Sequence, residues 1–145
     1  MATMSNQDVV RTLIEEGFNK GNLDAVDVLV AADCIEHQFG LGPGAEGTKQ
    51  AIRALRRGFP DFHLDIVDIV EQDNKVWIRM VSHGTNLGPF MGPPTGKETS
   101  ITVFDVARVA GGKIVEHWGS PDRFALMAQL GVLPRLDTKA ALAEA

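Results

Sequence analysis

Apolar residues in the first part of the chain recur at the three- and four-residue spacing that is typical of one buried helix face. Ser5 begins the first predicted helix, because its hydroxyl can cap the chain and Asp8 follows three residues later. Gly21 ends this helix, and Asn22 can cap a second, shorter one. A third helix is predicted over residues 48–58. The inward-facing side chains are Val9, Val10, Leu13, Ile14, Phe18, Leu23, Val26, Leu29, Ile52, Leu55 and Phe59.

The second half of the chain consists of long runs rich in Val, Ile and Thr, which favour β-strands. Strands are predicted over residues 62–71, 75–85, 98–110 and 113–120, with a brief extended segment at 33–39. Gly111-Gly112 is a hairpin signal between the last two strands. A closing helix is expected to end at Leu130, and residues 135–145 are expected to be frayed. Helices followed by strands predict an α+β fold, with helices packed on one face of a curved antiparallel sheet.

Composition narrows the class of protein. At 145 residues one domain is expected over 1–145, with its core at about 7–133. The net charge of −5 argues against nucleic acid as a partner, and no apolar run is long enough for a membrane span. The single cysteine excludes an internal disulfide, and the absence of tyrosine excludes a phenol as oxyanion donor. A cytoplasmic protein is expected.

Three motifs resemble one known family. They are Phe-Pro-Asp-Phe at 59–62, Gly-Pro-Phe-Met-Gly-Pro-Pro-Thr-Gly-Lys at 88–97, and Gly-Lys-Ile-Val-Glu-His-Trp at 112–118. Together they resemble the SnoaL-like polyketide cyclases, whose fold is the cone-shaped α+β barrel of nuclear transport factor two. The resemblance covers about residues 7–133 and implies ring closure by intramolecular aldol condensation, without metal or cofactor.

One departure from that family concerns its acid/base residue. Its characterised cyclases carry an aspartate two residues after the histidine that matches His117, and this position is Gly119 here. A second cyclase histidine falls at Asp105. The resemblance therefore implies either a rearranged His/Asp pair or the loss of catalysis.

Strand alternation places the candidate pair on one sheet face. Asp105 alternates with Val103, and His117 alternates with Gly119. If the Gly-Gly turn pairs the two strands, the carboxylate and the imidazole become cross-strand neighbours. A carboxylate raises the pKa of a neighbouring imidazole, which favours His117 as a general base near neutral pH. A buried structural hydrogen bond is the alternative interpretation.

His37 is a third candidate for catalysis. In this family a histidine at its position reaches the pocket mouth, and the alternative is that His37 is a rim residue.

Arg79 is a charged residue in an otherwise apolar strand. It would fit an epoxide hydrolase, in which an arginine and two aspartates activate water. The alternative is that Arg79 forms an ion pair at the surface. Trp77 is expected in the core. The candidate substrate contacts are Phe39, Arg79, Phe90, Met91, Val103 and Gly119.

The segment 42–47 matches G-x-G-x-x-G before a helix, but a dinucleotide site needs a parallel βαβ unit and the strands here are expected to be antiparallel. No histidine pair has the spacing of a metal site.

The leading hypothesis is a cofactor-free enzyme that acts on an apolar or oxygenated small molecule by aldol-type cyclisation or isomerisation. An epoxide-type hydrolase and a non-catalytic binding or dimerisation module are the alternatives. A homodimer is expected, because the strands carry apolar residues on both faces.

Overall fold

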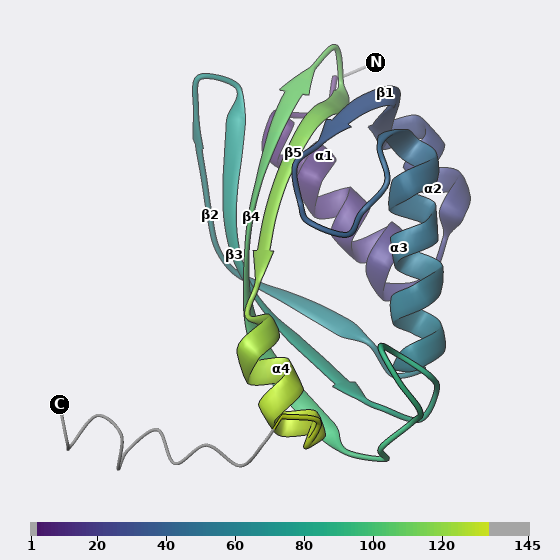
Figure 1. Ribbon diagram of the computed structural model, residues 1–145. Coiled ribbons are helices and arrows are strands. Elements are labelled where there is room, and N and C mark those ends of the chain that lie inside the picture. The colour runs from purple at the N-terminus through teal and green to yellow at the C-terminus, as the bar shows by residue number, and fades with distance from the viewer. Residues whose placement is uncertain (1–2, 134–145) are drawn as a thin grey trace, which may run out of the picture.

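The predicted order of helices and strands is confirmed by a computed structural model, which describes residues 3–133 (Figure 1). The tail expected to be frayed lies outside these residues. The elements are α1 (Asn6–Thr12), η1 (Leu13–Asn19), α2 (Leu23–Leu29), β1 (Val30–Glu36), α3 (Gly44–Gly58), β2 (His63–Gln72), β3 (Lys75–Thr85), β4 (Glu98–Ala110), β5 (Lys113–Pro121) and α4 (Arg123–Leu130).

The first predicted helix is divided into α1 and the wider π-helical segment η1. Its start is as expected, since the Ser5 hydroxyl accepts a hydrogen bond from the Asp8 amide at 3.1 Å. Gly17 lies where η1 meets α3, and a Cβ there would lie 3.4 Å from the Ile52 Cδ1 atom. Gly17 is therefore in packing distance of the α3 side chain Ile52.

The predicted α+β fold is confirmed, and the four long strands pair antiparallel as expected, whereas the short segment β1 makes the sheet mixed. Its order is β1-β5-β4-β3-β2, and β1 pairs with β5 in parallel while the other pairs are antiparallel. A helix and three strands separate β1 from β5, so no local turn determines the direction of this pairing. The segment expected at 33–39 also begins earlier, at Val30.

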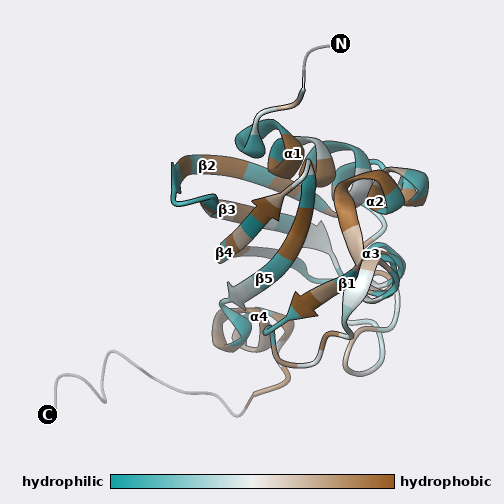
Figure 2. Cartoon of the chain, turned by 90° about the horizontal axis from the view of Figure 1, so that it is seen from above, coloured by the Kyte–Doolittle hydropathy of each residue, from teal (hydrophilic) through white to brown (hydrophobic). Residues whose placement is uncertain are grey.

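The two faces of the sheet have different surroundings. We call the face covered by α1, η1, α2 and α3 the inner face and the opposite one the outer face (Figures 1 and 2). Along β3, Val76, Ile78 and Met80 are buried on the inner face. Trp77 lies between them in the alternation and is 53% exposed on the outer face, so its predicted core position is wrong.

The glycines at 42–47 serve close packing at the start of α3. A Cβ on Gly47 would overlap the carbonyl oxygen of Gly42, and one on Gly44 would overlap the carbonyl oxygen of Ala32. Gly44 also has a φ of 74°, which favours glycine. These contacts give the motif a structural role, and α3 begins at Gly44 rather than at Thr48.

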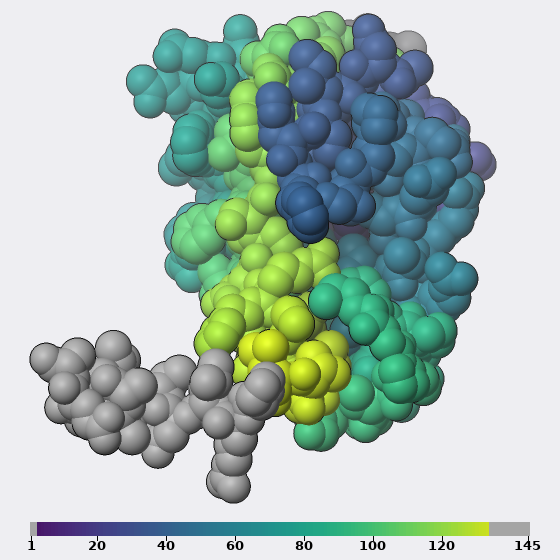
Figure 3. All heavy atoms as spheres, in the orientation of Figure 1, coloured from purple at the N-terminus to yellow at the C-terminus, as the bar shows by residue number. Residues whose placement is uncertain are grey.

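The loop between β3 and β4 is organised by Asn86, which is fully buried. Its side-chain amide donates to the carbonyls of Gly58 and Gly88, and its oxygen accepts from the Thr95 amide and hydroxyl. Arg123 at the start of α4 lies 5.5 Å from the Phe90 ring, so loop and helix meet at the surface (Figure 3).

The packing at the start of α3 gives a stability test. We expect Gly47→Ala to lower the free energy of unfolding by about 1–3 kcal/mol, because the methyl group has to displace backbone. Gly42→Ala is the matched control, since its Cβ would meet only ordinary contacts, the nearest at 3.6 Å from the Gly47 Cα atom. Urea unfolding of both variants measures this difference, and equal losses would contradict the packing role.

Candidate active site

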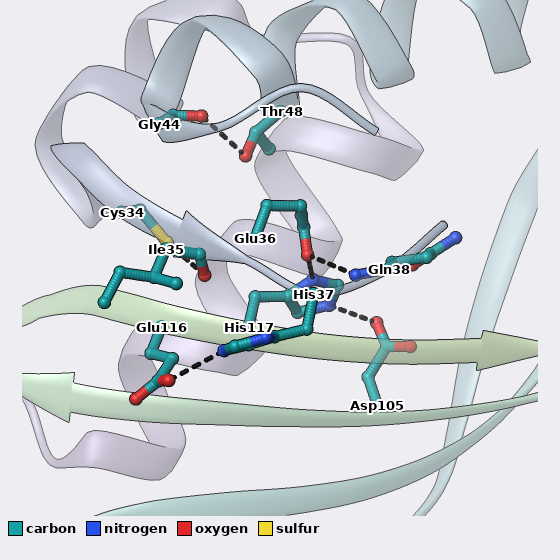
Figure 4. A network of polar contacts seen from close by, with 10 residues as sticks. All are labelled: Cys34, Ile35, Glu36, His37, Gln38, Gly44, Thr48, Asp105, Glu116 and His117. Carbon is teal, nitrogen blue, oxygen red and sulfur yellow. Dashed lines mark hydrogen bonds and ion pairs between the residues drawn. The ribbon is translucent and has the colours of Figure 1, made fainter. Parts of the chain in front are cut away.

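Three strands bring two carboxylates and one imidazole together on the inner face. Ala107 pairs with His117 across β4 and β5, and Glu36 pairs with His117 across β1 and β5. Asp105 precedes Ala107 by two residues and therefore shares its face. Figure 4 shows the His117 ring between Glu36 and Asp105.

His117 is hydrogen bonded at both ring nitrogens. Its Nε2 atom lies 3.0 Å from Asp105 Oδ2, which is the contact expected from the strand parity. Its Nδ1 atom lies 2.6 Å from Glu36 Oε2. Sequence reasoning missed Glu36, although its alternation with the buried Cys34 was a usable signal. What the sequence lacked was the parallel pairing that carries Glu36 to His117.

The two carboxylates determine the charge of the ring. Burial alone would lower the pKa of His117, but hydrogen bonds and charges from Asp105 and Glu36 outweigh it and raise the pKa from 6.5 to about 10. His117 is therefore an imidazolium at neutral pH and cannot act there as the general base that was expected. Because the pKa is raised on folding, this contribution to stability is complete below pH 6.5 and is lost as the pH rises through 10.

Asp105 has one oxygen left for chemistry. Its Oδ2 atom accepts from His117, whereas its Oδ1 atom is buried and has no hydrogen-bond partner among the described residues. A buried carboxylate oxygen without a donor is costly unless something else supplies one. Oδ1 is thus the oxygen of this cluster whose hydrogen bonding the described residues leave incomplete.

His37 does not join this cluster. The extended chain turns its ring to the outer face, where Nε2 lies 2.7 Å from Glu116 Oε2 and the ring stacks on Trp118 at 4.8 Å. The hydrogen bonds from His37 and Arg108 in turn lower the pKa of Glu116. The sheet therefore lies between His37 and Asp105. His37 was expected at the mouth of a pocket that it shares with Asp105, and this expectation is wrong.

Arg79 also lies on the outer face, where it forms an ion pair with Asp68 at 2.7 Å. Asp122 follows β5 and would be the second aspartate of such a site, but it caps α4 by accepting from the Ala125 amide. The arrangement of one arginine between two aspartates, expected for an epoxide hydrolase, is therefore not formed around Asp105.

The predicted substrate contacts are divided between several places. Val103 and Gly119 lie on the inner face with Asp105. Phe90 packs edge-on against Phe59 at 5.3 Å, while Met91 and Phe39 are 62% and 100% exposed. Of the apolar candidates, Val103 is therefore the one placed beside the cluster.

A hollow of about 540 Å³ lies on the outer face and not around His117. Its apolar side chains are Val70, Trp77, Phe104, Val106 and Trp118. Asp105 is among the residues that line this hollow and His117 is not, so the pair does not line it together. Strand parity directs both side chains to the opposite face. The cluster remains accessible there, with 17% of the Asp105 side chain and 20% of the His117 side chain exposed. Figure 3 shows a small hollow between the segment after β1, β5 and the loop at 86–97.

Within residues 3–133, no group of three His, Cys, Asp or Glu side chains has the arrangement of a metal site. None of the helices in the same range has the length and apolar character needed to cross a membrane.

The chain belongs to the SnoaL-like polyketide cyclase family, whose sequence profile matches residues 8–130. This confirms the resemblance noted in the sequence. No curated protein matches the chain.

Solved structures agree with this assignment. IdmH from Streptomyces antibioticus, described as a candidate polyketide cyclase, is 35% identical, with a TM-score of 0.78 over 88% of this chain and 99% of its own. TsrD from Streptomyces laurentii is 26% identical, with a TM-score of 0.81 over 88% and 95% of the two chains. AclR from Streptomyces galilaeus, described as a candidate hydroxylase, has a TM-score of 0.82 at 23% identity over 96% and 88%, which shows the shared fold.

The charge state of His117 can be measured directly. We expect its ring to stay protonated to above pH 8 in a nitrogen NMR titration, because two carboxylates hold the proton. Glu36→Gln should lower this pKa, since one hydrogen-bonded charge is lost. Glu116→Gln is the matched control, because Glu116 precedes His117 but pairs with His37 and Arg108 on the outer face. A normal His117 pKa in the unaltered protein would contradict the description of the cluster.

Proposed function

We propose that this chain is a cofactor-free enzyme of the polyketide-cyclase type, in which Asp105 removes a proton from the carbon next to a substrate carbonyl. The observation that carries the proposal is the unpartnered, buried Oδ1 atom of Asp105 beside a fixed imidazolium. Membership of the SnoaL-like family supports a small-molecule substrate with several carbonyl groups. The reaction class is an aldol-type cyclisation or an isomerisation.

The proposed steps follow one proton from the substrate to Asp105 and back. Asp105 Oδ1 accepts the α-proton, which leaves a neutral carboxyl group and a substrate enolate. In a cyclisation the enolate carbon forms a bond to a second carbonyl carbon, and the resulting alkoxide takes the proton back from Asp105. In an isomerisation the proton returns to a different atom of the substrate.

His117 contributes by holding Asp105 rather than by touching the substrate. Both of its nitrogens are engaged by carboxylates, so it has no N–H to offer to a bound molecule. Its hydrogen bond to Oδ2 holds the Asp105 side chain and thereby fixes the direction of Oδ1. Glu36 holds the ring from the other side.

The proton abstraction can be tested without knowing the natural substrate. In D₂O we expect the protein to accelerate deuterium exchange next to the carbonyl of 2-tetralone, measured by proton NMR. Asp105→Asn should slow this exchange by about 10²–10⁴-fold, because the general base is lost while the shape is kept.

Asp68→Asn is the matched control, since Asp68 pairs with Arg79 on the outer face and its loss should leave the exchange rate within about two-fold. Thermal melts establish that each variant is folded at the assay temperature. Exchange no faster than in buffer alone, or full activity of folded Asp105→Asn, would refute the proposal.

We further infer that the outer face joins two copies of the chain. Its uncovered apolar side chains include Val70, Trp77 and Phe104, which are 61%, 53% and 56% exposed. Such a contiguous apolar surface usually marks an interface. A second copy suits it, because the same face on both partners gives the two-fold arrangement that most homodimers use.

Sedimentation equilibrium tests this interface. We expect the unaltered protein to be dimeric at micromolar concentration and Phe104→Glu to shift it to monomer, because two like charges would meet in an apolar contact. Val28→Glu is the matched control, since Val28 is also exposed, at 67%, but lies on α2. A monomeric unaltered protein would contradict the inference.

A further inference from the structure

Gln38 occupies the space directly above Gly119. A Cβ built on Gly119 would overlap the side-chain amide oxygen of Gln38 and lie 3.0 Å from Asp105 Oδ1. Gln38 follows the end of β1, and its backbone amide donates to Glu36 Oε2 at 3.2 Å. The segment that supplies Glu36 to the cluster therefore also brings an amide side chain to Asp105 (Figure 4).

The amide is not used by the protein itself. No hydrogen bond joins the Gln38 side chain to another group among residues 3–133, and Asp105 Oδ1 beside it is also unpartnered. Rotation of the amide about its last side-chain bond exchanges its oxygen and its NH₂ group, so either can face a molecule next to Asp105. Two unused polar groups at one point indicate a place where a polar ligand group completes the hydrogen bonding.

Enolate chemistry at Asp105 needs a hydrogen-bond donor for the substrate oxygen. His117 cannot supply it, because Glu36 and Asp105 engage both of its nitrogens. Tyrosine cannot supply it either, because the chain has none. Once the amide is rotated, the Gln38 NH₂ group takes the place of its oxygen beside Oδ1 and is a neutral donor there.

We propose that Gln38 is the substrate-positioning residue of this site, whose side-chain NH₂ donates to the carbonyl oxygen next to the carbon that Asp105 deprotonates. This inference rests on the function proposed above. It also gives Gly119 a role, because any side chain at position 119 would take the place of the amide. The polar group that the family carries on β5 is replaced here by one that enters from the end of β1.

The test compares two ligands that differ by one oxygen, 2-tetralone and tetralin, whose binding is followed by NMR titration of labelled protein. We expect 2-tetralone to bind about 3–10-fold more tightly than tetralin, as one hydrogen bond to a neutral donor allows. Gln38→Met keeps the length of the side chain but removes the donor, so it should abolish this preference while tetralin binding stays within about two-fold.

The rate of deuterium exchange is a second readout. Loss of an oxyanion donor should lower the maximal rate of 2-tetralone exchange in Gln38→Met by about 10²-fold or more. Gln72→Met is the matched control, because Gln72 is exposed at the end of β2 and should leave both readouts unchanged. A wild-type protein that binds both ligands equally, or a preference that survives in folded Gln38→Met, would overturn the proposal.

A double-mutant cycle separates positioning from general damage. Gly119→Ala should also abolish the ketone preference, because its methyl group displaces the amide. In Gly119→Ala/Gln38→Met the second change should add nothing to the first, whereas additive losses would contradict the shared mechanism. Ligand preference does not require turnover, so a failure of exchange with an intact preference would refute the proposed reaction and leave the role of Gln38 standing.

Discussion

The clamp of His117 between Glu36 and Asp105 is the interaction on which the organisation of this site depends. It joins β1 to the β4–β5 hairpin, which lies far from β1 in the sequence, by hydrogen bonds of 2.6 and 3.0 Å. A single carboxylate would raise the pKa of the ring less than two do. Two carboxylates convert the ring into a fixed cation, and the base that we propose is the oxygen of Asp105 that the ring does not engage.

The loss of an acid at position 119 has a structural counterpart. With no side chain there, the space above β5 is filled from the neighbouring strand end by Gln38. An amide therefore lies where a side chain at position 119 would, and an empty position in a motif does not by itself indicate a lost site. The polarity of the atoms that fill the space over Gly119 says more about whether a site is kept there.

The sequence predicted those features that depend on local pattern. The bounds of β3 and β4 and the contact of Asp105 with His117 follow from alternation and from one Gly-Gly turn. Glu36 and Gln38 were missed, because their positions depend on a parallel pairing that no turn encodes. Trp77 and His37 were misplaced because hydrophobicity and family position outweighed strand parity in their assignment, although parity places both on the outer face.

The opposite chemistry of the two sheet faces connects the parts of the molecule. On the inner face, Glu36, His117 and Asp105 hydrogen bond to one another. This leaves the Oδ1 atom of Asp105 without a partner among the described residues. On the outer face, His37, Glu116 and Arg108 pair among themselves beside Trp118, which leaves aromatic and aliphatic surface facing outward. Since neighbouring residues of β1 and β5 point to opposite faces, a second copy covering the outer face would stiffen the strands that carry Glu36 and His117. Association and catalysis would then be coupled through the backbone of these two strands, without any residue of one face reaching the other.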